Sequence, residues 1–239
     1  RNADDGFDCY RADPDRPTLF KGCVAYKNGS DGEGNTGDGN GFKMAGGWQT
    51  GGNTAQFCVA YDNTARGFDT NGGSEVVTFQ HCTAFRNGTY GFQFTGDTDP
   101  DHIAQNCLSW KNKKANIANE WNVVSGNNSW DLSIGDPLFR STNPSMSDFL
   151  RLSQGSPAVD VGVDVGLRFS GEAPDLGTYE FQKEDGDDDG GDNGDAGNGD
   201  GSNGGSGGNG DGNGTSEPIN LTIQLDGDLE LTGTASSTS

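Results

Sequence analysis

Hydrophobic positions in the first 130 residues recur in short segments, separated by Gly, Asn and Asp. A short segment such as 75–79, bounded by turn residues, is typical of a β-strand. Two motifs keep step with these segments: the dipeptide Gly-Phe recurs at intervals of 35, 26 and 24 residues, and a cysteine precedes an aromatic residue by three positions. The copies are Gly6-Phe7, Gly41-Phe42, Gly67-Phe68 and Gly91-Phe92, with Cys23-Tyr26, Cys58-Tyr61, Cys82-Phe85 and Cys107-Trp110.

This repeat predicts an all-β fold, a parallel β-helix with three short strands per coil. A β-propeller is the alternative, but its repeat is longer and needs more strand per unit. In a β-helix the Phe and Cys columns become interior ladders with one rung per coil, about 4.8 Å apart. Buried, stacked thiols suit free cysteine, and one or two disulfides involving Cys9 are the other interpretation.

The repeat ends near residue 134, which divides the chain into four predicted parts. Residues 1–134 form the coils. Residues 135–182 form a last irregular coil and cap, because a stacked fold needs a terminal unit that stops further strand addition. Residues 183–216 form a linker predicted to be disordered, since Gly, Asp, Asn and Ser dominate it. Residues 217–239 alternate like one strand and open a further β domain.

The net charge of −21 is unevenly distributed. Residues 183–239 contain 13 acidic residues and one lysine, so much of the acidity belongs to the tail. The remainder is still acidic, which argues against nucleic acid as a partner. No apolar run approaches the roughly 20 residues of a membrane span. Because the chain starts at Arg1 on a motif that carries chemistry, we expect coils to precede it in a longer protein.

The residue after each Gly-Phe changes from copy to copy. Side chains alternate along a strand, so where Phe points inward the next residue points outward. Asp8, Lys43, Asp69 and Gln93 then form an outward column, with Lys43 one coil from each aspartate. A lysine there is either a general base whose pKa falls toward the working pH, or a surface lysine paired with Asp8 or Asp69.

Three carboxylates crowd into the first repeat, at Asp4, Asp5 and Asp8. Crowded carboxylates repel one another, and a hard cation such as calcium is one remedy. A solvated acidic turn is the alternative. Strict alternation buries Asp5, so we expect the chain to turn near it. A second acidic run, 185–190, matches the start of a calcium loop but has Ala196 where an EF-hand needs a bidentate glutamate.

These motifs resemble the catalytic core of family nine polysaccharide lyases, which are pectate lyases with a right-handed parallel β-helix. The resemblance covers about residues 1–180 and rests on the order and spacing of three segments, 2–8, 37–43 and 63–69. It implies a right-handed parallel β-helix and calcium-dependent β-elimination of polygalacturonate.

The resemblance also assigns roles to residues. Asp4, Asp5 and Asp8 match three of the four calcium-binding aspartates of the family, and Lys43 matches its base. The fourth aspartate belongs to a preceding coil that this sequence lacks. The implied partner is an acidic polysaccharide, polygalacturonate or pectin, bridged to an acidic protein by calcium. We expect a secreted monomer.

Several features leave alternatives open. Arg66 and Arg86 border the outward column and are either substrate-binding clamps for uronate carboxylates or solvated surface arginines. His81 and His102 are interpreted as surface or turn residues. The aromatic column is either a sugar-stacking stripe or a packing ladder; its members are Tyr26, Tyr61, Phe85 and Trp110.

Two other functions compete with a lyase. A non-catalytic β-helix that binds polysaccharide or acts as an adhesin is motivated by the acidic linker and the trailing domain. A hydrolase of the polygalacturonase type needs two carboxylates placed as acid and base around a scissile bond, and the sequence offers no convincing pair.

Overall fold

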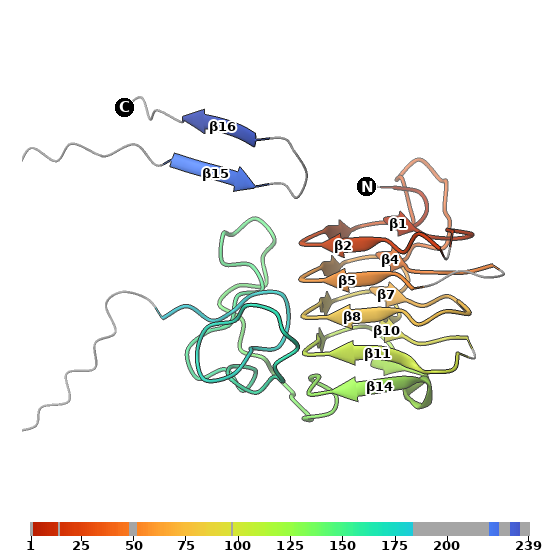
Figure 1. The fold of residues 1–239 in the computed structure, drawn as a ribbon. Coiled ribbons are helices and arrows are strands. Elements are labelled where there is room, and N and C mark those ends of the chain that lie inside the picture. The colour runs from red at the N-terminus through yellow and green to blue at the C-terminus, as the bar shows by residue number, and fades with distance from the viewer. Residues whose placement is uncertain are drawn as a thin grey trace, which may run out of the picture. The chain divides into compact units, whose positions relative to one another are not determined.

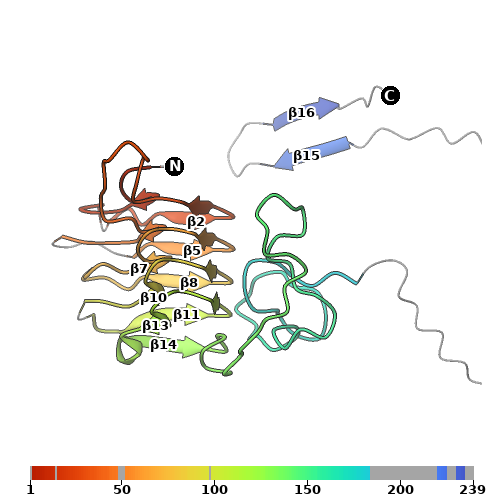
Figure 2. The same cartoon turned by 180° about the vertical axis from the view of Figure 1, so that it is seen from behind.

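The computed structural model describes residues 2–13, 15–47, 52–96 and 98–183, and the backbone of two strands further along. The chain divides into two compact units, Arg1–Asp188 and Asp189–Ser239. The first unit contains a parallel β-helix in which short strands stack into three sheets (Figure 1). The view from behind shows the same ladder of strands (Figure 2). The predicted β-helix is confirmed.

Each of the first four coils contributes one strand to each of the three sheets in turn, and the fifth contributes a strand to two of them. Sheet 1 contains β1 Phe7–Asp8, β4 Phe42–Lys43, β7 Phe68–Asp69, β10 Tyr90–Gln93 and β13 Ala115–Ala118. Sheet 2 contains β2 Leu19–Lys21, β5 Thr54–Gln56, β8 Thr78–Gln80, β11 His102–Gln105 and β14 Val123–Gly126. Sheet 3 contains β3 Val24–Tyr26, β6 Val59–Tyr61, β9 Thr83–Phe85 and β12 Leu108–Trp110. A 3-10 helix, η1, covers Glu120–Asn122.

The interior is built from ladders of like residues. Successive phenylalanine rings of sheet 1 stack with centroid separations of 4.8, 4.9 and 4.7 Å. Phe79 of β8 meets Phe68 and Phe92 edge-on, and small alanines of sheet 3 complete the core. The thiols of Cys58 and Cys82 are fully buried, and all five cysteines are free. The Phe and Cys ladders predicted from the repeat are therefore confirmed.

The glycine of each Gly-Phe motif is required by space. A Cβ added at Gly41 would lie 2.6 Å from the carbonyl oxygen of Gly67 and 2.9 Å from Nδ2 of Asn63. Because this glycine faces inward and the following phenylalanine also does, the chain bends between them. The chain bends next to Asp5 as expected, but Asp5 is still buried, at 5% exposure, with its Oδ2 3.2 Å from Lys43 Nζ.

An asparagine ladder that neither repeated motif reveals lies behind these glycines. Asn28 Nδ2 donates to Asn63 Oδ1 at 2.8 Å, Asn63 Nδ2 to Asn87 Oδ1 at 2.9 Å, and Asn87 Nδ2 to Asn112 Oδ1 at 2.9 Å. The residue before each asparagine has a left-handed backbone, with φ between 53° and 54°. The ladder satisfies buried amides at the bend between sheets 3 and 1.

Both histidines are buried, so the interpretation of them as surface or turn residues is wrong for His102 and holds for His81 only as a turn residue. His81 lies in the turn before β9 with φ 51°, and the side chain of His102 points inward at the start of β11. Burial lowers the pKa of His81 to about 4. The backbone NH of Val77 donates to Nδ1 of His102, which gives that ring a structural role.

Residues 135–183 are irregular and cover the outer face of sheet 3. Leu150 joins Val59, Tyr61 and Phe85 in one apolar cluster, with Phe139, Phe149 and Tyr179 packed against it. The hydroxyl of Thr178 donates to the carbonyl oxygen of Cys58 at 2.9 Å. The aromatic column of sheet 3 is thus a packing ladder rather than a sugar-stacking stripe, although Tyr26 at its end remains 46% exposed.

The second unit is described only by two strands, β15 Asn220–Gln224 and β16 Glu230–Thr234, which pair antiparallel. The single strand predicted near residues 217–239 is therefore the first of a pair. The predicted linker, apart from its first residue, and the acidic run at 185–190 lie outside the described residues. Among the residues that the structure describes, none belongs to a helix long and apolar enough to cross a membrane.

Candidate functional site

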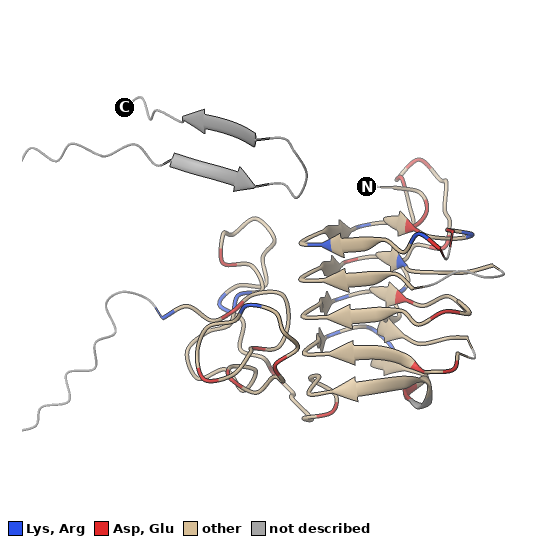
Figure 3. Cartoon of the chain, in the orientation of Figure 1, with Lys and Arg blue, Asp and Glu red and all other residues tan. Residues whose placement is uncertain are grey.

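Two columns of side chains point outward from sheet 1. The first follows each phenylalanine: Asp8 pairs in register with Lys43, Lys43 with Asp69, and Asp69 with Gln93. Acidic, basic and acidic positions therefore follow one another at the ends of β1, β4 and β7 (Figure 3). The second column precedes each Gly-Phe and contains Asp5, Asn40, Arg66 and Tyr90. The predicted outward column exists, but Lys43 and Asp69 are only 8% and 2% exposed.

Lys43 lies at the centre of a carboxylate cluster. Its Nζ is 3.0 Å from Asp38 Oδ2, 3.2 Å from Asp5 Oδ2 and 3.5 Å from Asp8 Oδ2. Although burial by itself lowers the pKa of Lys43, the hydrogen bond to Asp38 and the charges of Asp5 and Asp8 outweigh it and hold that pKa above its ordinary value. Lys43 is therefore an ammonium ion as long as these carboxylates are available to it.

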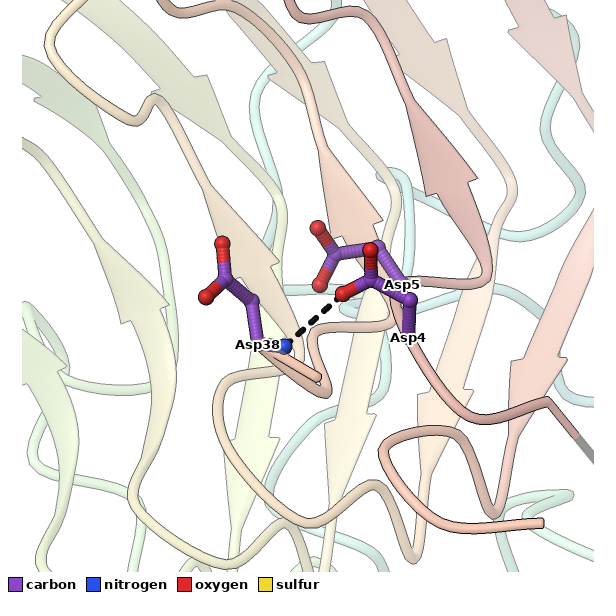
Figure 4. A group of neighbouring side chains, drawn as sticks. All are labelled: Asp4, Asp5 and Asp38. Carbon is purple, nitrogen blue, oxygen red and sulfur yellow. Dashed lines mark hydrogen bonds between the residues drawn. The ribbon is translucent and has the colours of Figure 1, made fainter. Parts of the chain in front are cut away.

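Asp4, Asp5 and Asp38 form a compact group of oxygen ligands. One carboxylate oxygen from each lies within 4.8 Å of the others, and the three side chains converge from the segments before β1 and β4 (Figure 4). The backbone NH of Asp38 donates to Asp4 Oδ1 at 2.8 Å, which ties the two segments together. Gly37 passes so close that a Cβ there would lie 2.4 Å from Asp4 Oδ1.

Asp5 is the buried member of this group, at 5% exposure. Its Oδ1 accepts a 2.7 Å hydrogen bond from the backbone NH of Asn40, and its Oδ2 lies 3.2 Å from Nζ of Lys43. Burial raises the pKa of Asp5 despite Asn40 and Lys43. A buried carboxylate beside two more carboxylates fits a hard divalent cation, which prefers oxygen ligands.

Asp8, the third predicted ligand, is placed differently. Its Oδ2 faces Lys43, and its Oδ1 accepts a 2.8 Å hydrogen bond from the backbone NH of Tyr10. The structure groups Asp38 rather than Asp8 with Asp4 and Asp5. Asp38 lies only five residues before Lys43, in the same Gly37–Lys43 segment. This closeness in sequence was the signal that could have identified it as a ligand candidate.

Arg66 extends the site to the next coil. Its Nε donates to Oε1 of Gln93 and lies 3.6 Å from Oδ2 of Asp69. Burial raises the pKa of Asp69 even though Asn71 and Arg66 favour its charged form. Arg66 therefore connects the two outward columns, and 34% of its side chain is exposed.

Arg86 is held at a different place. It makes a bidentate pair with Asp62 at 2.9 Å for both bonds, and its Nη1 donates to the carbonyl oxygen of Thr142 in the C-terminal segment. Its guanidinium also lies over the ring of Phe85, 4.4 Å from the centroid. These contacts belong to the bend after β9 and to the packing on sheet 3, and not to the cluster around Lys43.

Tyr10 was not singled out from the sequence, yet it lies beside Lys43. Its ring centroid is 5.4 Å from Lys43 Nζ, and 51% of the residue is exposed. The ring packs against Gly46, whose φ is 130° and where a Cβ would lie 3.0 Å from Tyr10 Cδ2. An exposed aromatic ring next to a lysine in this position was not detectable because Tyr10 lies outside both repeated motifs.

Known proteins share this arrangement of sequence and fold. Residues 1–106 match the family model "Pel9A-like, right handed beta helix region". Pectate lyase L of Dickeya chrysanthemi is 31% identical over 202 residues, which cover 75% of this chain and 45% of that protein. Pectate lyase L of Dickeya dadantii is 30% identical over 200 residues, with the same two coverages.

A solved structure gives the same result for the fold. The crystal structure of pectate lyase Pel9A superimposes with a TM-score of 0.67 at 28% identity, covering 75% of this chain and 48% of that chain. The chain thus spans about half the length of the relatives it matches. Together these likenesses identify it as a right-handed parallel β-helix similar to the family nine pectate lyases.

Proposed function

We propose that this β-helix is the catalytic part of a calcium-dependent pectate lyase that cleaves polygalacturonate by β-elimination. The observation that carries the proposal is the position of Lys43. It lies on β4, is nearly buried, and has its Nζ within 3.5 Å of Asp5, Asp8 and Asp38. The similarity to named pectate lyases supports the substrate class.

Calcium is assigned to Asp4, Asp5 and Asp38, with Asp8 next to them. Three carboxylates, one of them buried, supply the ligand type that this cation prefers. A bound calcium ion supplies Lewis acidity to the carboxylate of a uronate, which makes the proton at C5 more acidic.

Lys43 acts as the general base. Its neutral Nζ takes the C5 proton, the electrons of the C5–H bond form a C4=C5 double bond, and the glycosidic C4–O bond breaks. The leaving oxygen takes a proton from solvent. Without a cation the acidic cluster favours the ammonium form of Lys43, and carboxylates that ligated calcium would favour it less.

Arg66 is the proposed substrate ligand beside the base. Its guanidinium edge offers N–H donors suited to a carboxylate, one coil from Lys43. Asp69 and Gln93 hold it by Nε and fix its direction. Arg86 is assigned to packing, because Asp62 and Thr142 already bind its guanidinium. We further propose that the protein acts outside the cell, where polygalacturonate is found, as a monomer.

The test is formation of unsaturated products from polygalacturonate. We expect ultraviolet absorbance to rise with the calcium-loaded protein, to stop on chelation, and to fall by about 10³-fold in Lys43→Ala. Lys111→Ala is the control, because Lys111 is an exposed lysine of another loop, and this variant should keep full activity. Saturated products indicate a hydrolase, and binding without any turnover indicates the non-catalytic module.

A further inference from the structure

The outward face of sheet 1 changes in character along the coils. Near β1 and β4 it carries the carboxylates around Lys43. Arg66 precedes β7, Tyr90 begins β10, and Lys114 precedes β13. Backbone hydrogen bonds keep these residues in step, since Gly67 N donates to Tyr90 O at 3.0 Å and Lys114 N donates to Thr89 O at 2.8 Å. The face therefore passes from acidic to basic and aromatic.

Tyr90 and Lys114 form a pair on this face. The Nζ of Lys114 lies 5.5 Å from the centroid of the Tyr90 ring, and Lys114 is exposed. Tyr90 occupies the same column as Asp5 and Arg66, because each precedes a Gly-Phe dipeptide or its equivalent. Neighbouring coils are spaced by about 4.8 Å, so Tyr90 lies about one such step beyond Arg66.

A polyuronate carries one carboxylate on every sugar, so a bound chain presents a row of negative charges. The acidic end of the face needs a cation to accept such a chain. The end formed by Arg66, Tyr90 and Lys114 needs no such cation. Its cationic donors pair with carboxylates directly, and an aromatic ring stacks on a sugar face.

We propose that Tyr90 and Lys114 form an additional subsite that binds a uronate of the same polymer, one coil beyond Arg66. This subsite rests on the proposed function, because the occupant is the lyase substrate. Lys114 pairs with the carboxylate and Tyr90 supports the sugar ring. Long substrates that reach this subsite then gain affinity without any change in the chemistry at Lys43.

The loop before β13 provides a matched control. Lys111 is also exposed, but its Nζ lies 3.9 Å from the centroid of Trp110, on sheet 3. Lys114→Glu and Lys111→Glu therefore make the same change of charge within one loop. A difference between them reports position rather than net charge.

The experiment has two arms. In the first, affinity for fluorescently labelled polygalacturonate is measured with each glutamate variant in a Lys43→Ala background. In the second, KM and kcat are measured with Lys43 present. We expect Lys114→Glu to weaken affinity and raise KM about tenfold with kcat unchanged, and Lys111→Glu to change either by less than about twofold. Tyr90→Ala should raise KM about fivefold, and Tyr90→Phe should restore it.

The outcomes separate the subsite from the lyase activity. Cleavage with equal KM values for the two glutamate variants overturns the subsite and leaves the proposed function standing. Binding that depends on Lys114 in a protein without lyase activity overturns the proposed function and supports polysaccharide binding at this face. Absence of both binding and cleavage in the wild-type protein overturns both.

Discussion

The outer faces of sheets 1 and 3 belong to the same coils, but one is covered by the C-terminal segment and the other carries the candidate site. On sheet 3, aromatic and aliphatic residues repeat from coil to coil and lie under residues 135–183, so that Phe85 is 1% exposed. On sheet 1, the outward residue changes at every coil, from Asp8 to Lys43 to Asp69 to Gln93. Repetition accompanies packing against the C-terminal segment, and variation accompanies the candidate chemistry.

The difference follows from what each face contacts. A face covered by another part of the chain gains free energy from every buried apolar group, which favours the same residue type on each coil. A face that holds a ligand needs different groups at defined positions, and it tolerates crowded carboxylates and a buried lysine that stability alone does not favour. The two faces should therefore respond differently to substitution.

Removing a ring from the covered face should have the largest effect. Phe85→Ala takes away a fully buried ring that contacts Trp110, Phe139 and Phe149, so we expect unfolding free energy to fall by about 3–5 kcal/mol. Tyr26→Ala, in the same column but 46% exposed and stacked on Tyr61, should cost only about 1 kcal/mol. Denaturant titration measures both, and equal losses would contradict the covering of sheet 3.

Acid should lower the free energy of unfolding through His81, which lies in the turn before β9 of sheet 3. Burial lowers the pKa of this residue from 6.5 to about 4, so the unfolded chain binds its proton first as pH falls. The stability contributed by the neutral ring is complete above pH 6.5 and is lost between pH 6.5 and about 4, by at most about 3 kcal/mol.

His81→Asn isolates this contribution, because Asn106 occupies the equivalent left-handed turn on the next coil. Melting temperatures at pH 7 and pH 4.5 provide the measurement. The variant should show a smaller decrease than the wild-type protein, and an unchanged decrease would place the acid sensitivity elsewhere, for example at the buried His102.

On the outer face of sheet 1, substitution should affect calcium rather than stability. Asp38→Asn removes one member of the carboxylate group, so the calcium concentration for half-maximal activity should rise about 10- to 100-fold. Asp62→Asn, which breaks the pair with Arg86 beside sheet 3, should leave that concentration unchanged. If this calcium concentration rose equally in both variants, Asp38 would act only through the net charge of the protein and not as a ligand.

The sequence was sufficient to predict the coils because their interior repeats. The Phe and Cys columns follow from spacing alone, and Lys43, Asp4 and Asp5 follow from motifs of known order. Tyr10 was missed because it lies outside the repeated motifs. Asp38 was missed although it lies in the 37–43 segment, because contact across coils decides which carboxylates meet. The burial of His81 and the covering of sheet 3 depend on residues 135–183, whose packing carries no period.

The central claim is that the carboxylates around Lys43 control its proton. The most direct measurement is the pH dependence of lyase activity at low and at saturating calcium. Because the acidic cluster raises the pKa of Lys43, activity should increase with pH as the amine loses its proton. Calcium bound by these carboxylates would weaken their hold on the Lys43 proton, so the increase of activity with pH should move to lower pH by about one unit. The account would be contradicted if activity rose over the same pH range at both calcium concentrations. It would also be contradicted if the same rise persisted in Lys43→Ala.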